Sequence, residues 1–250
     1  MKKIQDNFSK QSDVYKKYRP NYPRELYDDL LRLTKEQGSC WDCGTGNGQV
    51  ALELSKHFEK VYATDISENQ ISKADKRNNI VYSIARAEQT SFETDKFDLI
   101  TVAQALHWFD FAEFSKEINR VAKDKAILAI WGYGLLRIDD SIDILIDGFY
   151  KDIVGPYWNQ ERKYVDTAYK TISLDFKEIK LKKEYQIKTN WTLNDLEGYL
   201  NSWSSVQNFI AINHKNPVDD LIGLIDRIWD DKSRKEVRFP IFTRMGRIEK

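Results

Sequence analysis

Residues 40–50, CWDCGTGNGQV, contain overlapping patterns that bind ligands or carry redox chemistry in proteins. Cys40 and Cys43 form a C-x-x-C pair, as in redox and metal sites. Residues 46–51 fit the G-x-G-x-x-A pattern of dinucleotide-binding folds. Asp42 precedes alternating glycines, which makes the stretch D-x-G-x-G-x-G. The alternatives are therefore a redox or metal site, a nicotinamide site and another kind of nucleoside-cofactor site.

A redox or metal role for the two cysteines is the weakest of these interpretations. A reactive C-x-x-C lies at the start of a helix, where the helix dipole lowers the thiol pKa. Here Cys40 falls inside a predicted strand, and glycines separate Cys43 from the next helix. A zinc site needs further ligands, and the sequence has no second pair of cysteines or histidines. We expect both cysteines to pack in the interior, and we predict no metal site.

The glycines, together with a second acid, predict a nucleoside cofactor. Gly44, Thr45, Gly46 and Gly48 connect a predicted strand to a predicted helix, so their backbone amides would face a ligand. Asp65 ends the next predicted strand, where a carboxylate can bind both hydroxyls of a ribose. The alternative is that Asp65 caps the following helix, but Ser67 already fits that role.

Asp42 indicates which cofactor binds. A carboxylate at this strand end repels a pyrophosphate and attracts an ammonium group, directly or through water. S-adenosylmethionine carries an ammonium group and a sulfonium but no phosphate. We therefore predict S-adenosylmethionine as the cofactor. An NAD(P)-dependent oxidoreductase and a non-catalytic nucleotide-fold binding protein are the alternatives.

Alternating strand and helix patterns predict an α/β fold with a doubly wound, mostly parallel sheet of seven strands. The clearest strand patterns cover residues 39–43, 61–64, 80–84, 97–103 and 126–131. We expect an N-terminal helical lid over residues 1–38 and a cofactor-binding core over 39–132. Residues 133–250 would add substrate-covering helices and the final strands of the same domain. Pro240 in the last predicted strand favours an edge or irregular position.

Composition narrows the functional classes. Hydrophobic residues make up 41% of the chain, and 39 basic residues balance 39 acidic ones. Balanced charge disfavours nucleic-acid binding, because phosphate contacts usually require a basic excess. The start of the chain lacks a secretory apolar segment, and no apolar run approaches the roughly 20 residues that span a bilayer. We expect a soluble, cytoplasmic protein without membrane or nucleic-acid partners, either a monomer or a weak homodimer.

Several segments in order resemble class I S-adenosylmethionine-dependent methyltransferases: WDCGTGNG, VYATDIS, SIARAEQTSF, FDLITVAQALHWFD and FSKEINRVAK. The resemblance implies that Ala87 and Glu88 lie near the adenine and that Ile66 and Gln104 also line the cofactor site. It also implies that the N-terminal segment closes over the cofactor, with Tyr18 or Arg19 near the cofactor carboxylate. Tyrosines that only pack on the core are the alternative for that segment.

Further segments resemble a narrower group, the small-molecule methyltransferases similar to trans-aconitate methyltransferase and to a yeast cantharidin-resistance enzyme. These segments are YKKYRPNYP, YWNQERKYVD, YLNSWSSVQNF and FPIFTRMGR. One departure is the turn before the fifth strand, where Asp124 and Lys125 replace the family's proline and glycine. We expect the turn still to form. The resemblance implies a small methyl acceptor, with carboxylate-bearing molecules among the candidates.

His107 is the candidate catalytic residue, since it follows the fourth predicted strand, where the crevice of such folds opens. It would act as a base or orient the substrate by a hydrogen bond; the alternative is a histidine packed between aromatic neighbours. Methyl transfer needs an in-line nucleophile, and it needs a base only when the acceptor must lose a proton. Candidate substrate residues are Tyr15, Trp108, Trp158, Arg162 and Trp203.

Overall fold

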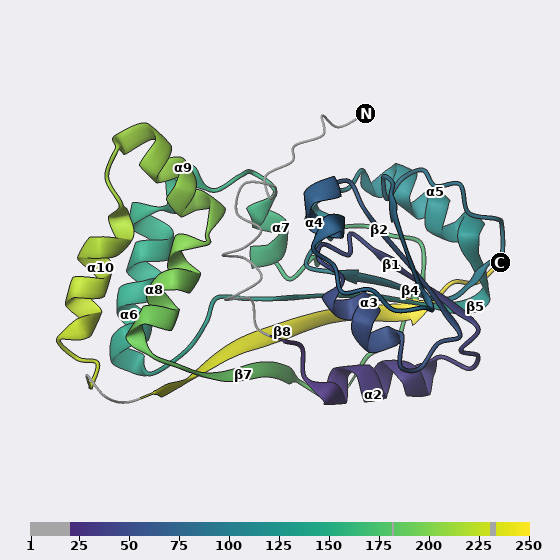
Figure 1. Ribbon diagram of the computed structural model, residues 1–250, viewed down its shortest axis with the longest axis horizontal. Coiled ribbons are helices and arrows are strands. Elements are labelled where there is room, and N and C mark those ends of the chain that lie inside the picture. Colours follow the sequence, from purple (N-terminus) through teal and green to yellow (C-terminus); the bar gives the residue numbers. More distant parts are fainter. Residues whose placement is uncertain (1–20, 182, 231–233) are drawn as a thin grey trace.

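The structure, a computed structural model, describes residues 21–181, 183–230 and 234–250 (Figure 1). A single sheet runs through the molecule in the order β3-β2-β1-β4-β5-β8-β6, and β7 also pairs with β8. The strands are β1 (Ser39–Cys43), β2 (Lys60–Asp65), β3 (Ile80–Ile84), β4 (Phe97–Ala103), β5 (Ala122–Tyr133), β6 (Lys177–Glu178), β7 (Tyr185–Trp191) and β8 (Lys235–Arg247).

The five parallel strands lie where the sequence patterns predict them. β1 pairs with β2 on one side and with β4 on the other, so the strand order reverses between β1 and β4. In doubly wound sheets, ligands bind at this reversal, outside the carboxyl ends of the strands. The predicted mostly parallel sheet is confirmed. Among the residues that the structure describes, the sheet has eight strands when the two-residue β6 is included.

Helices cover both faces of the sheet, which separates the core into two layers. On one face, α2 (Arg24–Leu33) and α3 (Gln49–Leu54) bury Leu26, Leu30 and Leu54. On the other, α5 (Phe111–Val121) buries an apolar stripe that includes Phe114 and Ile118. The short helix α4 (Glu68–Ser72) follows β2, and the Ser67 hydroxyl accepts a hydrogen bond from Gln70 N, which confirms the predicted cap.

The cysteine pair is divided between these two layers. Cys40 packs in the layer with α2 and α3, while Cys43 packs in the layer with α5. Residues an odd number of positions apart on a strand face opposite sides, so the two thiols cannot meet. Burial also raises the pKa of both thiols well above the usual value, which keeps them protonated and unreactive. Both cysteines are structural, as predicted.

A second group of helices, here called the cap lobe, packs at one end of the sheet (Figure 1). It consists of α6 (Asp140–Gly148), the π-turn η3 (Phe149–Ile153), the turn η4 (Gly155–Tyr157), α8 (Leu193–Asn201), α9 (Ser204–Asn213) and α10 (Pro217–Asp226). The helix α7 (Arg162–Asp166) lies between the cap lobe and the core. Thr192 opens α8 as predicted, in a capping box with Asp195.

The long strand β8 joins the cap lobe to the core. Its first half pairs with β7 and its second half with β5 and β6, so the expected edge position of Pro240 is wrong. The alternative of an irregular position agrees with the structure, because β8 passes the end of β5 at Pro240, where Gly134 N donates to the Pro240 carbonyl. Few ladder bonds are lost there to the missing N–H.

The unusual turn at Asp124 and Lys125 also forms, as an irregularity near the start of β5, where the pairing with β4 shifts register between Ala122 and Ile127. Lys125 has a φ of 64°, in the left-handed region that glycine adopts without strain. Its N–H donates to the Ile248 carbonyl at 2.8 Å, which ties the turn to the chain after β8. Within the described ranges, no helix combines the length and the apolar character that a membrane span needs.

Candidate cofactor and acceptor site

The loop between β1 and α3 adopts a backbone that requires glycine. Gly44, Gly46 and Gly48 have φ values of 69°, 55° and 83°. A Cβ at Gly44 would lie 2.6 Å from the Ala105 Cβ, so this position is closely packed. A Cβ at Gly46 would meet no atom within 4 Å. The loop is therefore packed against Ala105 at Gly44 and open at Gly46. The open space leaves room for a ligand to approach the Gly46 backbone.

Asp42 lies beneath this loop. Its side chain is 1% exposed, and its carboxylate accepts hydrogen bonds from the hydroxyls of Thr45, at 2.5 Å, and Thr101, at 2.8 Å. Burial raises the pKa of Asp42 to about 6, although these hydrogen bonds oppose the rise. Asp42 thus shapes the loop from inside, and in this structure it presents no surface for direct contact with a ligand.

Asp65 connects the same loop to the end of β2. One carboxylate oxygen accepts from Gly46 N at 2.8 Å, and the other accepts from Ser67 N at 2.9 Å. Ile66, next along the chain, is 41% exposed, which is unusual for an isoleucine and leaves an apolar surface beside the acid. A carboxylate at the end of β2 next to an apolar surface suits a ribose and its purine.

Glu88 and Gln104 hold the ends of neighbouring segments together. Glu88 accepts from the backbone N–H of Asp110 at 2.8 Å and pairs with Arg86 at 3.2 Å, while Ala87 is buried beside it. Gln104 has a φ of 53°, and its side-chain oxygen accepts from Tyr133 N at 2.9 Å, joining the carboxyl ends of β4 and β5. Both residues therefore lie just beyond the carboxyl ends of parallel strands, Glu88 after β3 and Gln104 after β4.

His107 and Trp108 follow β4 in the turn η2 (Leu106–Trp108). His107 is 7% exposed, and its Nδ1 lies 2.7 Å from the hydroxyl of Tyr169. The rings of His107 and Trp108 are 4.8 Å apart. No pattern in the sequence predicts this role for Tyr169, because it lies 62 positions after His107 and only the fold brings the two side chains together.

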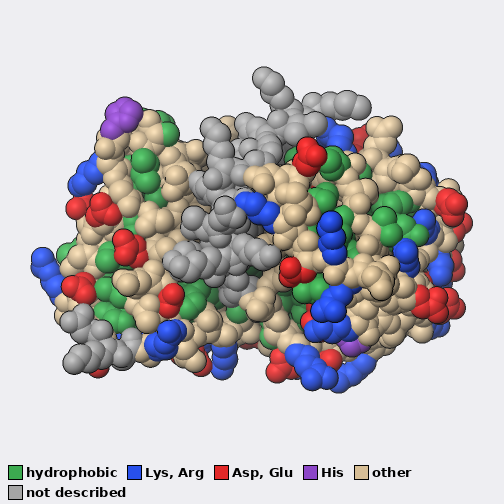
Figure 2. Space-filling model, viewed as in Figure 1, with side chains coloured by type: hydrophobic (Ala, Val, Ile, Leu, Met, Phe, Trp, Pro, Cys, Tyr) green, Lys and Arg blue, Asp and Glu red, His purple; other side chains and the backbone are tan. Residues whose placement is uncertain are grey.

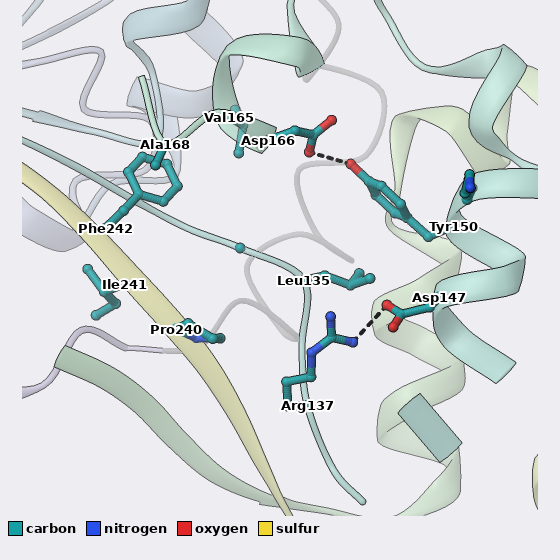
Figure 3. A pocket seen from close by; sticks show the side chains of 12 residues that line it. Leu135, Arg137, Asp147, Tyr150, Val165, Asp166, Ala168, Pro240, Ile241 and Phe242 are labelled. Carbon is teal, nitrogen blue, oxygen red and sulfur yellow. Dashed lines mark hydrogen bonds and ion pairs between the residues drawn. The ribbon is translucent and has the colours of Figure 1, made fainter. Parts of the chain in front are cut away.

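A cavity of about 680 Å³ opens between the core and the cap lobe (Figure 3). Pro240, Ile241 and Phe242 of β8 form one wall, and Asp147, Tyr150 and Lys151 of the cap lobe form the other. That volume suits a small organic molecule. Across it, Arg137 pairs with Asp147 at 2.7 Å, and the Tyr150 hydroxyl donates to Asp166 at 2.6 Å, as Figure 3 shows.

Three of the predicted substrate residues meet at Tyr150. The ring centroid of Tyr150 is 5.3 Å from that of Trp158 and 5.8 Å from that of Trp203. The Arg162 guanidinium lies over the Trp158 ring at 4.7 Å, and its Nε donates to the Tyr150 hydroxyl at 2.7 Å. Burial raises the pKa of Tyr150 above its usual value, so the phenol stays protonated. The other predicted site residues, Tyr15, Tyr18 and Arg19, lie outside the described residues.

The fold and these contacts together define a class of protein. A sheet reversal that carries a glycine loop, a buried acid beneath it and an acid at the end of β2 is the arrangement of class I S-adenosylmethionine-dependent methyltransferases. Known proteins agree. The family described as a methyltransferase domain matches residues 41–130. A protein of Dictyostelium discoideum that is named as a methyltransferase is 32% identical over 255 residues, covering 99% of this chain and 97% of that protein. The chain therefore belongs to the S-adenosylmethionine-dependent methyltransferase family.

Two further relatives support the assignment. The structure of a protein named as a type II methyltransferase, from Anaeromyxobacter dehalogenans, superposes with a TM-score of 0.86 at 33% identity, covering 93% of this chain and 99% of that one. A Saccharomyces cerevisiae protein named as an S-adenosylmethionine-dependent methyltransferase is 23% identical over 168 residues, 62% of this chain and 58% of its own length. The cofactor is S-adenosylmethionine, and the oxidoreductase and non-catalytic alternatives are set aside.

Proposed function

We propose that this methyltransferase acts on a small molecule that carries a carboxylate, held in the cavity between β8 and the cap lobe. The observation that carries the proposal is the position of this cavity beside the carboxyl ends of the sheet. Phe242 lines the cavity and would touch any Cβ at Gly132, and Gln104 reaches the same glycine from the cofactor side. An acceptor in the cavity would therefore lie next to the cofactor crevice.

The residues that would hold the cofactor are those around the glycine loop. Asp65 would accept hydrogen bonds from ribose hydroxyls, Ile66 and Ala87 would pack against the adenine, and the open backbone at Gly46 would face the methionine part. Asp42 would act on the cofactor ammonium group through its electric field and through the shape that it gives to the glycine loop. Tyr18 and Arg19 belong to the proposed N-terminal lid over residues 1–38. The cofactor supplies an electrophilic methyl group bonded to a positively charged sulfur.

Arg162 is the candidate receptor for the acceptor carboxylate; it does not itself line the cavity but contacts Tyr150 and Asp166, which do. Its Nε is held by Tyr150 and lies 3.2 Å from Asp166, which fixes the plane of the guanidinium. Its two terminal nitrogens form no hydrogen bond with any residue that the structure describes. A guanidinium oriented in this way can bind a carboxylate through two parallel hydrogen bonds.

Trp158 adds a second donor beside Arg162. Its indole Nε1 is buried and lacks a hydrogen-bond partner among residues 21–181, 183–230 and 234–250. A buried donor without a partner is costly, and an anionic acceptor would satisfy it. Lys151, exposed on the cavity wall, is a further cation. Together these groups favour an anionic acceptor, as in the group similar to trans-aconitate methyltransferase, to which we propose this chain belongs.

A carboxylate acceptor makes the chemistry simple. S-adenosylmethionine, when bound, would supply the methyl group to a carboxylate oxygen of the acceptor, and its sulfur would leave with the bond electrons as a neutral thioether. No proton is released, so no base is required. The protein accelerates the step by holding the oxygen in line with the methyl carbon and by excluding water. His107 lies at the crevice and would orient the acceptor.

The distribution of surface charge bears on whether the protein binds nucleic acid. Basic and acidic side chains are interspersed over the face shown in Figure 2, as expected for a chain with no net charge. We propose that the protein has no nucleic-acid partner and functions as a monomer or weak homodimer.

A screen for methylated products tests the acceptor. Purified protein is incubated with S-adenosylmethionine and with trans-aconitate and other polycarboxylates, each beside its neutral amide. We expect the acids to be methylated and the amides to be poor acceptors. Arg162→Lys, which keeps the charge but loses the planar fork, should raise KM for an acid about tenfold with little change in kcat. Equal methylation of acids and amides would contradict the carboxylate proposal.

A further inference from the structure

Arg137 is a charged residue of the cavity wall whose guanidinium makes a single hydrogen bond to the described part of the chain. Its Nη1 donates to Oδ1 of Asp147 at 2.7 Å, as Figure 3 shows, and both residues line the cavity. Nε and Nη2 of Arg137 have no partner among the residues that the structure describes. Because a guanidinium carries five N–H donors, most of the hydrogen-bonding capacity of this side chain is available to a ligand.

The backbone at Arg137 is fixed by strand β8. Its N–H donates to the Arg238 carbonyl at 2.8 Å, and its carbonyl accepts from Arg238 N at 2.8 Å, which makes an antiparallel bridge. Arg238 lies two positions before Pro240, where the β8 wall of the cavity begins. A receptor whose main chain is already fixed loses little conformational freedom when its side chain binds a ligand. Arg137 can therefore change partners without a rearrangement of the backbone.

The ion pair with Asp147 is weak enough to be replaced. The side chains of Arg137 and Asp147 are 38% and 52% exposed, and ion pairs at such exposed positions contribute little to stability. This pair forms its hydrogen bond through one nitrogen and one oxygen. A carboxylate ligand can instead bind a guanidinium through two parallel hydrogen bonds, which is the stronger arrangement. A carboxylate in the cavity would therefore compete well against Asp147.

Lys151 can neutralise Asp147 when Arg137 changes partner. It follows Asp147 by four positions on the helical segment formed by α6 and η3, a spacing at which opposite charges pair on a helix. Both side chains line the cavity, and Lys151 has no ion pair with any described residue. The other acid of the wall, Asp166, is already paired with Arg162 at 3.2 Å. The exchange therefore leaves each acid of the wall with a cation.

We propose that Arg137 is an acceptor-binding residue, which pairs with Asp147 until the carboxylate of the methyl acceptor replaces it. Asp147 is then an internal competitor that lowers the affinity for the acceptor and passes to Lys151 when the acceptor binds. This inference rests on the proposed function, because the acceptor carboxylate is the ligand. Arg162 contacts the cavity wall through Tyr150, whereas Arg137 is a cation of the wall itself.

Calorimetric titration of trans-aconitate into the protein saturated with S-adenosylhomocysteine measures acceptor affinity without turnover. We expect Arg137→Gln to raise the Kd about tenfold or more, because charge-assisted hydrogen bonds are lost, and Arg137→Lys to give an intermediate Kd. Asp147→Asn removes the competitor and should lower the Kd about two- to fivefold. Asp152→Asn, which removes an exposed carboxylate of η3 that does not line the cavity, is the matched control and should leave the Kd unchanged.

The double variant Arg137→Gln/Asp147→Asn separates partner exchange from a general effect of charge. If Asp147 acts through Arg137, then Asp147→Asn should give no gain in affinity in the Arg137→Gln background. An equal gain in both backgrounds would overturn the inference, because Asp147 would then repel the acid directly. An unchanged Kd in Arg137→Gln, or a gain in Asp152→Asn as large as that in Asp147→Asn, would overturn it as well.

Methylation assays with the same acids distinguish this inference from the proposed function. If the acids bind with the expected pattern but are not methylated, the proposed function is wrong and Arg137 is still a carboxylate receptor. If the acids are methylated and Arg137→Gln binds them as the wild type does, the proposed function stands and the role of Arg137 is wrong. A wild-type protein that neither binds nor methylates any of the acids would contradict both.

Discussion

At the scale of single residues, burial gives Asp42 a structural role in the glycine loop instead of a direct contact with the cofactor. Its position before the glycines indicates the cofactor, yet its carboxylate is 1% exposed and bonded to two threonine hydroxyls. The residue therefore builds the loop, and any effect on the cofactor ammonium passes through the field and the loop shape. A buried carboxylate of this kind also makes the stability of the protein depend on pH.

Asp42→Asn tests that dependence. The folded-state pKa of about 6 exceeds the model-peptide value of 3.8, so the stability that Asp42 contributes is present below about pH 4 and is lost as the pH rises through about 6. Asparagine does not titrate. We expect the free energy of unfolding of the variant, relative to wild type, to rise by about 2 kcal/mol between pH 4 and pH 7.

Urea unfolding at several pH values measures this difference. Asp152→Asn, which changes an exposed carboxylate on the turn η3, is the control and should follow the wild-type curve. Parallel curves for wild type and Asp42→Asn would show that Asp42 keeps an ordinary pKa in the folded protein.

At the scale of elements, different glycines of the loop between β1 and α3 serve the packing of the protein and the binding of a ligand. Gly44 is packed against Ala105, whereas the space around Gly46 is open, although both have positive φ. The two glycines therefore serve different purposes. Gly44 permits close contact between the loop and the segment after β4, and Gly46 leaves its backbone accessible to the cofactor.

Alanine at these two positions should have opposite main effects. Gly44→Ala combines backbone strain with a steric clash, so we expect it to lower the free energy of unfolding by about 2 kcal/mol or more. Gly46→Ala carries the strain alone, about 1–2 kcal/mol, but we expect it to raise the Kd for S-adenosylhomocysteine at least tenfold, or about 1.4 kcal/mol. Calorimetric titration and urea unfolding of both variants measure the two effects. Unchanged affinity in Gly46→Ala would place the cofactor elsewhere.

At the scale of the whole molecule, the core and the cap lobe both line the cavity that we propose for the acceptor. The core supplies the carboxyl ends of the parallel strands. The cap lobe supplies Tyr150, which lines the cavity, and Trp158 and Trp203, which pack against Tyr150. Strand β8 contributes to both lobes, because it pairs with β5 in the core and with β7 beneath the cap lobe. A ligand that binds the folded crevice should therefore stabilise the native state of the entire chain.

S-adenosylhomocysteine at a hundredfold excess over its Kd should raise the free energy of unfolding by about 2.7 kcal/mol. NAD at the same concentration is the matched control and should leave the free energy of unfolding unchanged, because its pyrophosphate would meet the carboxylates near the loop. Thermal or urea unfolding with each ligand measures both effects. Stabilisation by NAD alone would contradict the assigned cofactor.

Much of the core could be predicted because its signals are local. Strand patterns for residues 39–43, 80–84 and 97–103 match the observed strands, since a buried parallel strand is a short apolar run bounded by turns. The cap at Ser67 and the helix start at Thr192 follow from side chains that bond to amides a few residues away. The edge position expected for Pro240 failed, because strand pairing depends on partners far along the chain.

The sequence by itself determined the parallel core and the cofactor, because the glycines and acids follow adjacent strands of the predicted sheet, whose carboxyl ends share one edge. Only the tertiary structure decided that Tyr169 reaches His107 and that Tyr150 joins Trp158 and Arg162 beside one cavity. Those contacts join segments without any regular spacing, and they form only when β8 and the cap lobe pack against the core. The proposed acceptor site is therefore a product of long-range packing, whereas the motif that indicates the cofactor is local in the sequence.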